Sequence, residues 1–199
     1  MRNTRYIFVG LVLCWATGLA AANKPIDGFG KPDKITIEVA PLAAKGQWVA
    51  AVVLENDEEL AAITIPLKFG ERVGQFKLDS VRFDNTRVSY FALKTTNSHD
   101  SLNSVLVGLM YEFGGDRPPL APGIGQVARL YFTQQGKPAN PPVPPAIDST
   151  FFLPYNTLGL VTPSAEAITP IFETVRMEKL TEFKLPQEKK AAKPTEKPH

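Results

Sequence analysis

The chain has 199 residues, of which 44% are hydrophobic, 21% are charged and 10% are aromatic, and its formal net charge is +2. A body of about 150 residues can bury roughly two-thirds of its unfolded surface, so one domain with appendages can fold on its core alone. The near-neutral charge argues against nucleic acid as a partner, because such binding depends on clustered basic residues.

The first 22 residues have the pattern of a secretory signal peptide. Arg2 and Arg5 supply positive charge, Tyr6 to Ala16 is an apolar run, and Ala20 to Ala22 offers small residues for cleavage after Ala22. An uncleaved signal anchor is the alternative, although the apolar run is short for a membrane span of about 20 residues. We expect an exported protein, in the periplasm, at the cell surface or outside the cell, that is not an integral membrane protein after cleavage.

Cleavage would also change the composition of the mature chain. It would remove Cys14, the only cysteine, so the mature protein would have no disulfides. A lipoprotein signal is disfavoured because Leu13, before the cysteine, is large. The loss of Arg2 and Arg5 would bring the 22 basic residues down to 20, equal to the 20 acidic ones.

Composition also marks the two flanks of the expected domain. Residues 23–33 are rich in glycine, proline and charge and indicate a flexible lead-in segment. Residues 184–199 are rich in lysine and proline and indicate a solvated, disordered tail. The expected domain therefore covers residues 34–183.

Alternation of apolar and polar residues predicts the strands in this domain. Ile35, Ile37 and Val39 alternate with polar residues in the first strand, and both faces of the next, residues 48–54, are apolar, which indicates a central position. The row Ile63, Ile65, Leu67 and Phe69 should face the core. Pro66 has no N–H to donate, so it predicts a sheet edge or a bulge. Further strands are expected at residues 76–83, 88–94, 104–111, 126–133, 150–153, 159–161 and 172–177.

This pattern predicts an all-β fold, a two-sheet antiparallel sandwich of about nine strands. Helix is expected only briefly, near residues 98–103 or 164–168. The loops at 114–125 and 136–145 carry several prolines and should be extended and stiff.

The residues for catalysis are scarce, so the sequence predicts a protein that is not an enzyme. His99 and His199 are the only histidines, and His99 with Asp100 indicates a solvated polar loop rather than a catalytic triad. Residues 57–59, Asp-Glu-Glu, indicate a hydrophilic hairpin tip rather than the pair of carboxylates that a glycosidase needs.

No cofactor is expected, and calcium is the one metal considered. Glu112 and Asp116 flank two glycines and could coordinate calcium, but the spacing of an EF-hand loop is absent. Trp48 lies in a strand that is apolar on both faces and is expected in the core, not on a sugar-binding surface. The other aromatic residues considered for a sugar platform are Tyr90, Phe91, Tyr111, Phe113, Tyr131 and Tyr155.

The order of these segments resembles the cohesin family, the β-sandwich modules that bind dockerins. WVAAVVLEN, LAAITIPLKFG and KLDSVRFDNTRV look like consecutive cohesin segments, and SVLVGLMY and PGIGQVARLYF resemble a later pair. The resemblance covers residues 34–178 and implies a jelly-roll topology with nine strands. The chain departs from the family after the third strand, where residues 69–72 are Phe-Gly-Glu-Arg, so the partner stays unnamed.

Cohesins use one sheet face for their partner. Carried onto this chain, that face would present Thr64, Lys68, Ser104 and Leu106. We therefore expect an exported, non-catalytic module that binds another protein, or a cell-surface or extracellular component, through a sheet face. The alternative is a carbohydrate-binding module, for which a polysaccharide is the partner and an exposed aromatic strip is required.

Overall fold

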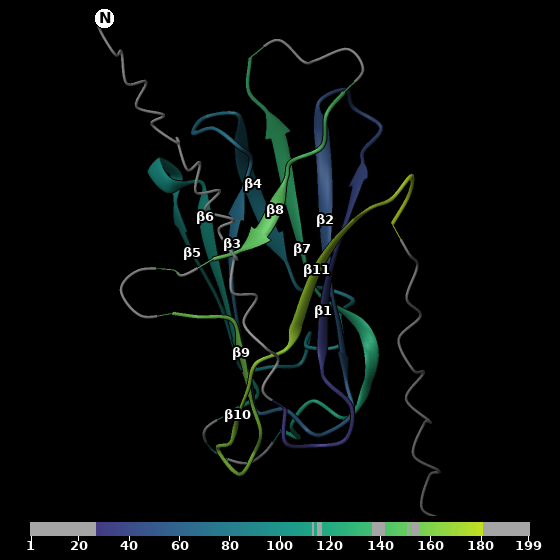
Figure 1. The fold of residues 1–199 in the computed structure, drawn as a ribbon, viewed down its shortest axis with the longest axis vertical. Coiled ribbons are helices and arrows are strands. Elements are labelled where there is room, and N and C mark those ends of the chain that lie inside the picture. The colour runs from purple at the N-terminus through teal and green to yellow at the C-terminus, as the bar shows by residue number, and fades with distance from the viewer. Residues whose placement is uncertain are drawn as a thin grey trace, which may run out of the picture.

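A computed structural model describes residues 27–112, 114, 117–136, 142–150, 152 and 156–180. The signal peptide and the tail both lie outside these residues, so these expectations stay predictions. The described residues form two packed β-sheets (Figure 1). The strands are β1 (Lys34–Pro41), β2 (Gln47–Asn56), β3 (Ala62–Phe69), β4 (Phe76–Arg82), β5 (Leu93–His99), β6 (Ser104–Met110), β7 (Gly123–Gln134), β8 (Ile147–Ser149), β9 (Gly159–Val161), β10 (Ala167–Ile168) and β11 (Ile171–Arg176).

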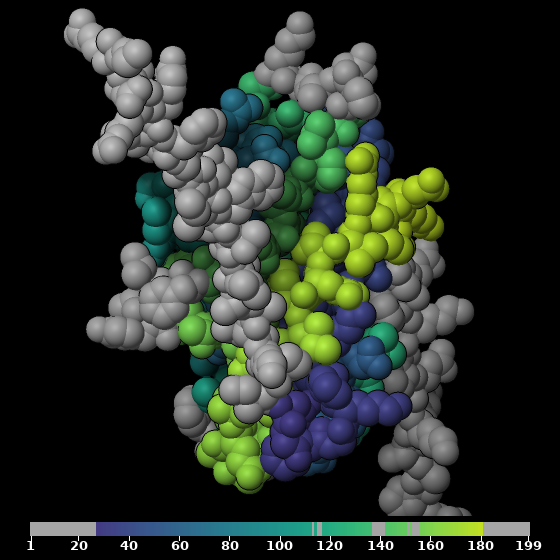
Figure 2. All heavy atoms as spheres, viewed as in Figure 1, coloured from purple at the N-terminus to yellow at the C-terminus, as the bar shows by residue number. Residues whose placement is uncertain are grey.

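The two sheets divide the strands between them. One has five strands in the order β11-β1-β2-β7-β4, and the other has six, in the order β10-β9-β3-β6-β5 with β8 also paired to β3. All pairs are antiparallel except β1 with β11, which run parallel from Lys34 beside Ile171 to Val39 beside Arg176. Figure 2 shows these N-terminal and C-terminal segments, purple and yellow-green, side by side on one surface. The expected all-β sandwich is confirmed, with eleven strands in the described residues because several are only two or three residues long.

The core lies between the sheets and is made of the inward rows of the central strands. The predicted row Ile63, Ile65, Leu67 and Phe69 is buried, and Trp48 is 2% exposed, so both expectations are confirmed. From the opposite sheet, Phe132 of β7 brings its ring centroid to 5.1 Å from that of Phe69. Both faces of β2 are buried, as expected of a central strand.

Pro66 lies in a central strand but at a gap in its pairing. On one side β3 pairs continuously with β6, and Pro66 lies opposite Leu106. On the other side, β9 pairs with residues 62–64 and β8 with residues 67–69. The Pro66 carbonyl accepts from Thr150 N on this second side, at 3.1 Å, so the missing N–H also falls there, between the two short partners.

The strand predicted at residues 88–94 is misplaced. Residues 87–90 form turns, and the strand predicted at 88–94 begins at Leu93 and runs to His99. The apolar residues that suggested it, Val88 and Phe91, are buried from a turn rather than from a strand. The strand predicted at 150–153 falls partly on residues 151 and 153, outside the described residues, and the described strand next to it is Ile147–Ser149. The brief helix near 98–103 is a 3-10 turn at Asp100–Leu102, and residues 167–168 of the other candidate are strand.

Asn103 holds the turn between β5 and β6. Its backbone is left-handed, with φ 48° and ψ 45°. Its side-chain Nδ2 donates to Arg72 O at 2.6 Å, and Oδ1 accepts from Gly74 N at 3.4 Å. Asn103 therefore joins the β5–β6 turn to the β3–β4 loop.

We expect Asn103→Ala to lower the free energy of unfolding by roughly 2 kcal/mol, because alanine loses the hydrogen bonds and is strained at this φ. Asn103→Gly keeps the backbone conformation and should cost about 1 kcal/mol. Urea denaturation measures both, with exposed Asn97→Ala as the control, expected within about 0.5 kcal/mol of the parent. Equal losses in the alanine and glycine variants would contradict the backbone part of this argument.

Candidate functional site

The outer face of the six-stranded sheet is built from side chains that alternate with the core rows. Register places them in three rows that cross β5, β6 and β3. The rows are Leu93, Met110 and Ala62; Thr95, Gly108 and Thr64; and Asn97, Leu106 and Pro66. At the end of the face, His99, Ser104 and Lys68 form a fourth row, with Asp148 of β8 beside Lys68.

Small residues flatten the middle of this face. Thr64 lies opposite Gly108 on one side and Gly159 on the other. A Cβ atom at Gly108 would lie 2.8 Å from Thr95 Oγ1, which shows how closely Thr95 covers this glycine. The centre of the face is therefore shallow, without long side chains.

The structure places all four residues predicted for partner binding on this outer face. Lys68 is exposed, and Thr64 and Leu106 are half-buried. Ser104 is only 6% exposed. Thr64, Lys68 and Leu106 are therefore open to a partner, and Ser104 offers little surface.

Phe152 contacts the face at the Ser104 end. Its ring centroid lies 4.5 Å from that of His99, which is opposite Ser104 in register. Phe152 is 1% exposed although it belongs to the connection between β8 and β9. His99 therefore packs against an aromatic ring, whereas its sequence context predicted a solvated loop.

Charge distinguishes the two outer faces of the sandwich. On the six-stranded sheet, the charged side chains of the face are Lys68 and Asp148, which lie opposite each other in register. The outer face of the five-stranded sheet carries Lys34, Glu38, Glu55, Lys77, Arg82, Arg129 and Glu173. Interface centres are depleted in charged residues, so the six-stranded sheet has the face better suited to a protein partner.

Sequence reasoning missed the part of this face that β5 contributes. Leu93, Thr95 and Asn97 lie on it and are exposed. The usable signal was the run of β-branched and polar residues in LKTTNSH, since threonine favours strands.

The other site types weighed from the sequence find less support. Of the aromatic residues weighed for a sugar platform, Trp48 and Phe91 are buried, Tyr111 packs against the core and Tyr90 is 36% exposed. Phe113 and Tyr155 lie outside the described residues. Glu112 has a buried, unpaired Oε2 atom, but Asp116 lies outside the described residues and calcium between them stays a prediction. Four other carboxylates do lie together, at one end of the five-stranded sheet: Asp27, Asp33, Asp57 and Glu58.

The arrangement of the two sheets matches solved structures. The cohesin of the Coh-OlpA–Doc918 complex of Clostridium thermocellum, a type I cohesin–dockerin complex, superposes with a TM-score of 0.52 at 15% identity, covering 74% of this chain and 100% of that one. The fold is cohesin-like. A type II cohesin, A11 of Bacteroides cellulosolvens, superposes with a TM-score of 0.54 at 11% identity, covering 71% of this chain and 95% of that one.

A third neighbour is the cohesin of the Coh-OlpC–Doc435 complex of Clostridium thermocellum. It superposes with a TM-score of 0.54 at 10% identity, covering 76% of this chain and 99% of that one. No family model and no curated protein matches the sequence. The identities are low, so these neighbours show the fold alone. None of the helices in the described part of this cohesin-like chain has the length and apolar character to cross a membrane.

Proposed function

We propose that the chain is an exported, non-catalytic module that binds a partner protein through the outer face of β8, β3, β6 and β5. The observation that carries this proposal is the contrast between the two outer faces. The face on the six-stranded sheet is shallow and has one pair of opposite charges, whereas the outer face of the five-stranded sheet has a charged side chain on each of its strands.

Two further observations support it. Cohesin-like neighbours of this chain were solved as complexes with dockerins, so a dockerin-like protein is the first partner to test. The ring of His99, which the sequence offered as a catalytic candidate, packs against that of Phe152. Export rests on the leader pattern of residues 1–22.

The experiment measures binding of immobilised full chain to purified type I and type II dockerins, and to proteins of the source's secreted fraction that are then identified and purified. Leu106→Arg places a long charged side chain at the centre of the face, and Lys68→Glu reverses its one positive charge. Each is expected to weaken binding of the identified partner by at least about tenfold, equivalent to ~1.4 kcal/mol.

The matched control is Lys77→Glu, which makes the same charge reversal on the outer face of the five-stranded sheet, where Lys77 is 69% exposed. It should leave the dissociation constant unchanged. Loss of binding with Lys77→Glu, but not with Leu106→Arg, would place the interface on the other sheet.

A further inference from the structure

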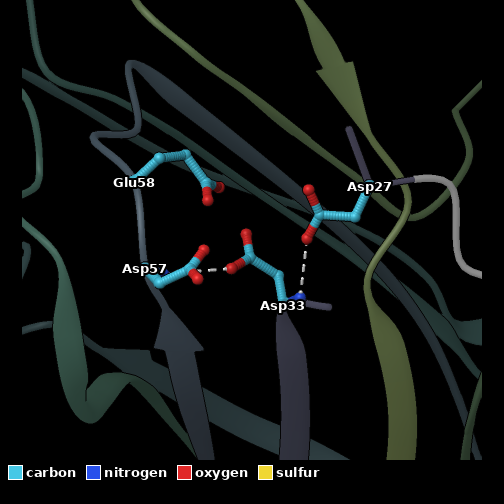
Figure 3. A group of neighbouring side chains, drawn as sticks. All are labelled: Asp27, Asp33, Asp57 and Glu58. Carbon is cyan, nitrogen blue, oxygen red and sulfur yellow. Dashed lines mark hydrogen bonds between the residues drawn. The ribbon is translucent and has the colours of Figure 1, made fainter. Parts of the chain in front are cut away.

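Four carboxylates gather at one end of the five-stranded sheet, away from the proposed binding face. Asp27 and Asp33 precede β1, and Asp57 and Glu58 follow β2 (Figure 3). The two strands are antiparallel neighbours, with Lys34 opposite Glu55, so the start of β1 lies beside the end of β2. One oxygen from each of the four groups lies within 4.8 Å of the others.

Backbone N–H groups fix the orientation of three of these carboxylates. Asp27 accepts from Phe29 N and Asp33 N, both at 2.9 Å. Asp57 Oδ2 accepts from Lys31 N at 2.7 Å. Asp33 Oδ1 accepts from Asp57 N at 3.3 Å. The segment before β1 was expected to be flexible, but its Lys31 and Asp33 are hydrogen-bonded to Asp57 of the β2–β3 turn.

Gly30 makes the close approach of these two segments possible. Its φ is +50°, and a Cβ atom there would lie 2.1 Å from Asp57 Oδ2. Only glycine fits both the backbone conformation and the space. The loop is therefore shaped around the carboxylate of Asp57.

Asp33 is the observation that points to a ligand. It is 1% exposed, and its Oδ2 atom has no hydrogen-bond partner. Figure 3 shows its carboxylate between those of Asp57, Glu58 and Asp27. Both carboxylate oxygens of Glu58 are also buried without a partner. A buried, unpaired carboxylate is costly, and the cost is removed by a cation or by a proton.

The nearby basic groups that the structure describes do not provide that cation. The Arg87 guanidinium donates to Asn56 Oδ1 and to the carbonyls of Leu54, Ala121 and Gly123. Lys31 meets the group through its backbone N–H, and its ammonium acts on Asp57 only through its charge. Burial, as the largest cause, raises the pKa of Asp33 to about 6 and that of Glu58 to about 8.

The donor set and its size fit calcium. Calcium takes oxygen ligands at about 2.4 Å, so two ligands on opposite sides of one ion are about 4.8 Å apart. The separations within this group do not exceed that value. A hollow of about 250 Å³, lined in part by Asp33, Asp57 and Gly123, gives an ion and its remaining waters access to the group.

We propose that Asp27, Asp33, Asp57 and Glu58 form a calcium site that fastens the segment before β1 to the β2–β3 turn. The ion would bridge the carboxylates of the two segments and so add a link between them. The competing arrangement is a proton shared between Asp33 and Glu58.

Calorimetry and thermal unfolding of the full chain distinguish a calcium site from a shared proton. Starting in EDTA at about pH 8, calcium is added to about 10 mM, above the weakest dissociation constants of extracellular calcium modules, about 10⁻³ M. We expect saturable binding of one ion and a rise in Tm of roughly 5–10 °C at about 100 times the dissociation constant. Magnesium should give a smaller rise, because it demands a tighter octahedral site.

Variants test the assignment of the ligands. Asp33→Asn and Glu58→Gln should each weaken calcium binding roughly 10- to 100-fold. In EDTA, Asp33→Asn should be at least as stable as the parent, because it removes a buried negative charge. The matched control, Glu71→Gln, removes an exposed carboxylate at the far end of β3 and should bind calcium like the parent.

The pH dependence gives a second readout. The folded-state pKa values of Asp33 and Glu58 are raised, so the folded protein binds more protons than the unfolded chain between the ordinary values of about 4 and the raised values of about 6 and 8. In EDTA, stability should fall as pH rises through this window, and Glu58→Gln should flatten the fall. Saturating calcium binds the ionised carboxylates and should therefore reduce this fall in stability.

The absence of both binding heat and a Tm shift with calcium would overturn the site, as would calcium binding that Asp33→Asn and Glu58→Gln leave unchanged. A fall in stability with pH that is the same with and without calcium would assign the group to a shared proton.

Discussion

Replacing Phe69 by alanine is expected to lower the free energy of unfolding by about 3–5 kcal/mol, the cost of emptying a large aromatic site in a core. Phe69 is 2% exposed, and its ring meets Phe132 at an interplanar angle of 52°. The two residues belong to different sheets, β3 and β7, so their contact joins the halves of the sandwich. Chemical denaturation followed by circular dichroism measures the loss.

A double-mutant cycle isolates the aromatic contact from the rest of the burial. Phe69→Leu and Phe132→Leu keep apolar volume, and their coupling energy should be about 0.5–1.5 kcal/mol. Val73→Ala is the control, since Val73 is 66% exposed, and it should change stability by less than about 0.5 kcal/mol. A coupling energy of zero would mean that the two rings contribute through burial alone.

Replacing Arg87 by methionine is expected to cost about 2–4 kcal/mol of unfolding free energy, although arginine is usually a surface residue. Its two terminal nitrogens donate to Asn56 Oδ1 at 2.8 Å and to the carbonyls of Leu54, Gly123 and Ala121 at 3.1, 2.8 and 2.5 Å. Burial lowers the pKa of this guanidinium from its ordinary value, yet the group stays charged because that value is so high. Methionine fills similar space but removes these hydrogen bonds, and only the Ala121 carbonyl, of the acceptors named, keeps a side-chain donor, Asn56 Nδ2 at 3.3 Å.

The planar fork of arginine is the feature under test. Arg87→Lys should recover little of the loss, since one ammonium cannot reach acceptors arranged around two nitrogens. Arg82→Met, at an exposed position of β4, is the matched control and should stay within about 0.5 kcal/mol of the parent. Full recovery of stability in the lysine variant, measured by urea denaturation, would contradict the role given to the fork.

A strand could be predicted from the sequence where buried and exposed residues alternate along it. In β3, inward Ile63 and Ile65 alternate with Thr64 and Lys68, so two neighbours in sequence differ in burial and the strand can be recognised. In β5, nearly every side chain is exposed because the strand forms the edge of its sheet. Its sequence therefore shows no alternation of apolar and polar residues. The strand was predicted too early, over the preceding turn, because Val88 and Phe91 in that turn are apolar.

The acidic group was missed for a different reason. Residues 57–59 looked like a hydrophilic hairpin tip because consecutive acids are usually solvated. Asp27 and Asp33 lie in a segment whose glycines and prolines indicated flexibility. Only the pairing of β1 with β2 brings these distant residues together, and that pairing is a property of the folded sheet.

The parallel pairing of β1 and β11 sets how the domain would carry a mechanical load. Lys34 lies beside Ile171 and Val39 beside Arg176, so residues 34 and 176 leave the pair at opposite ends. A pull between them runs along the two strands and loads their hydrogen bonds in shear, all together instead of one after another. The Lys34–Glu173 ion pair, at 2.5 Å, and the Thr36–Glu173 hydrogen bond, at 3.1 Å, lie across the same boundary and would share that force.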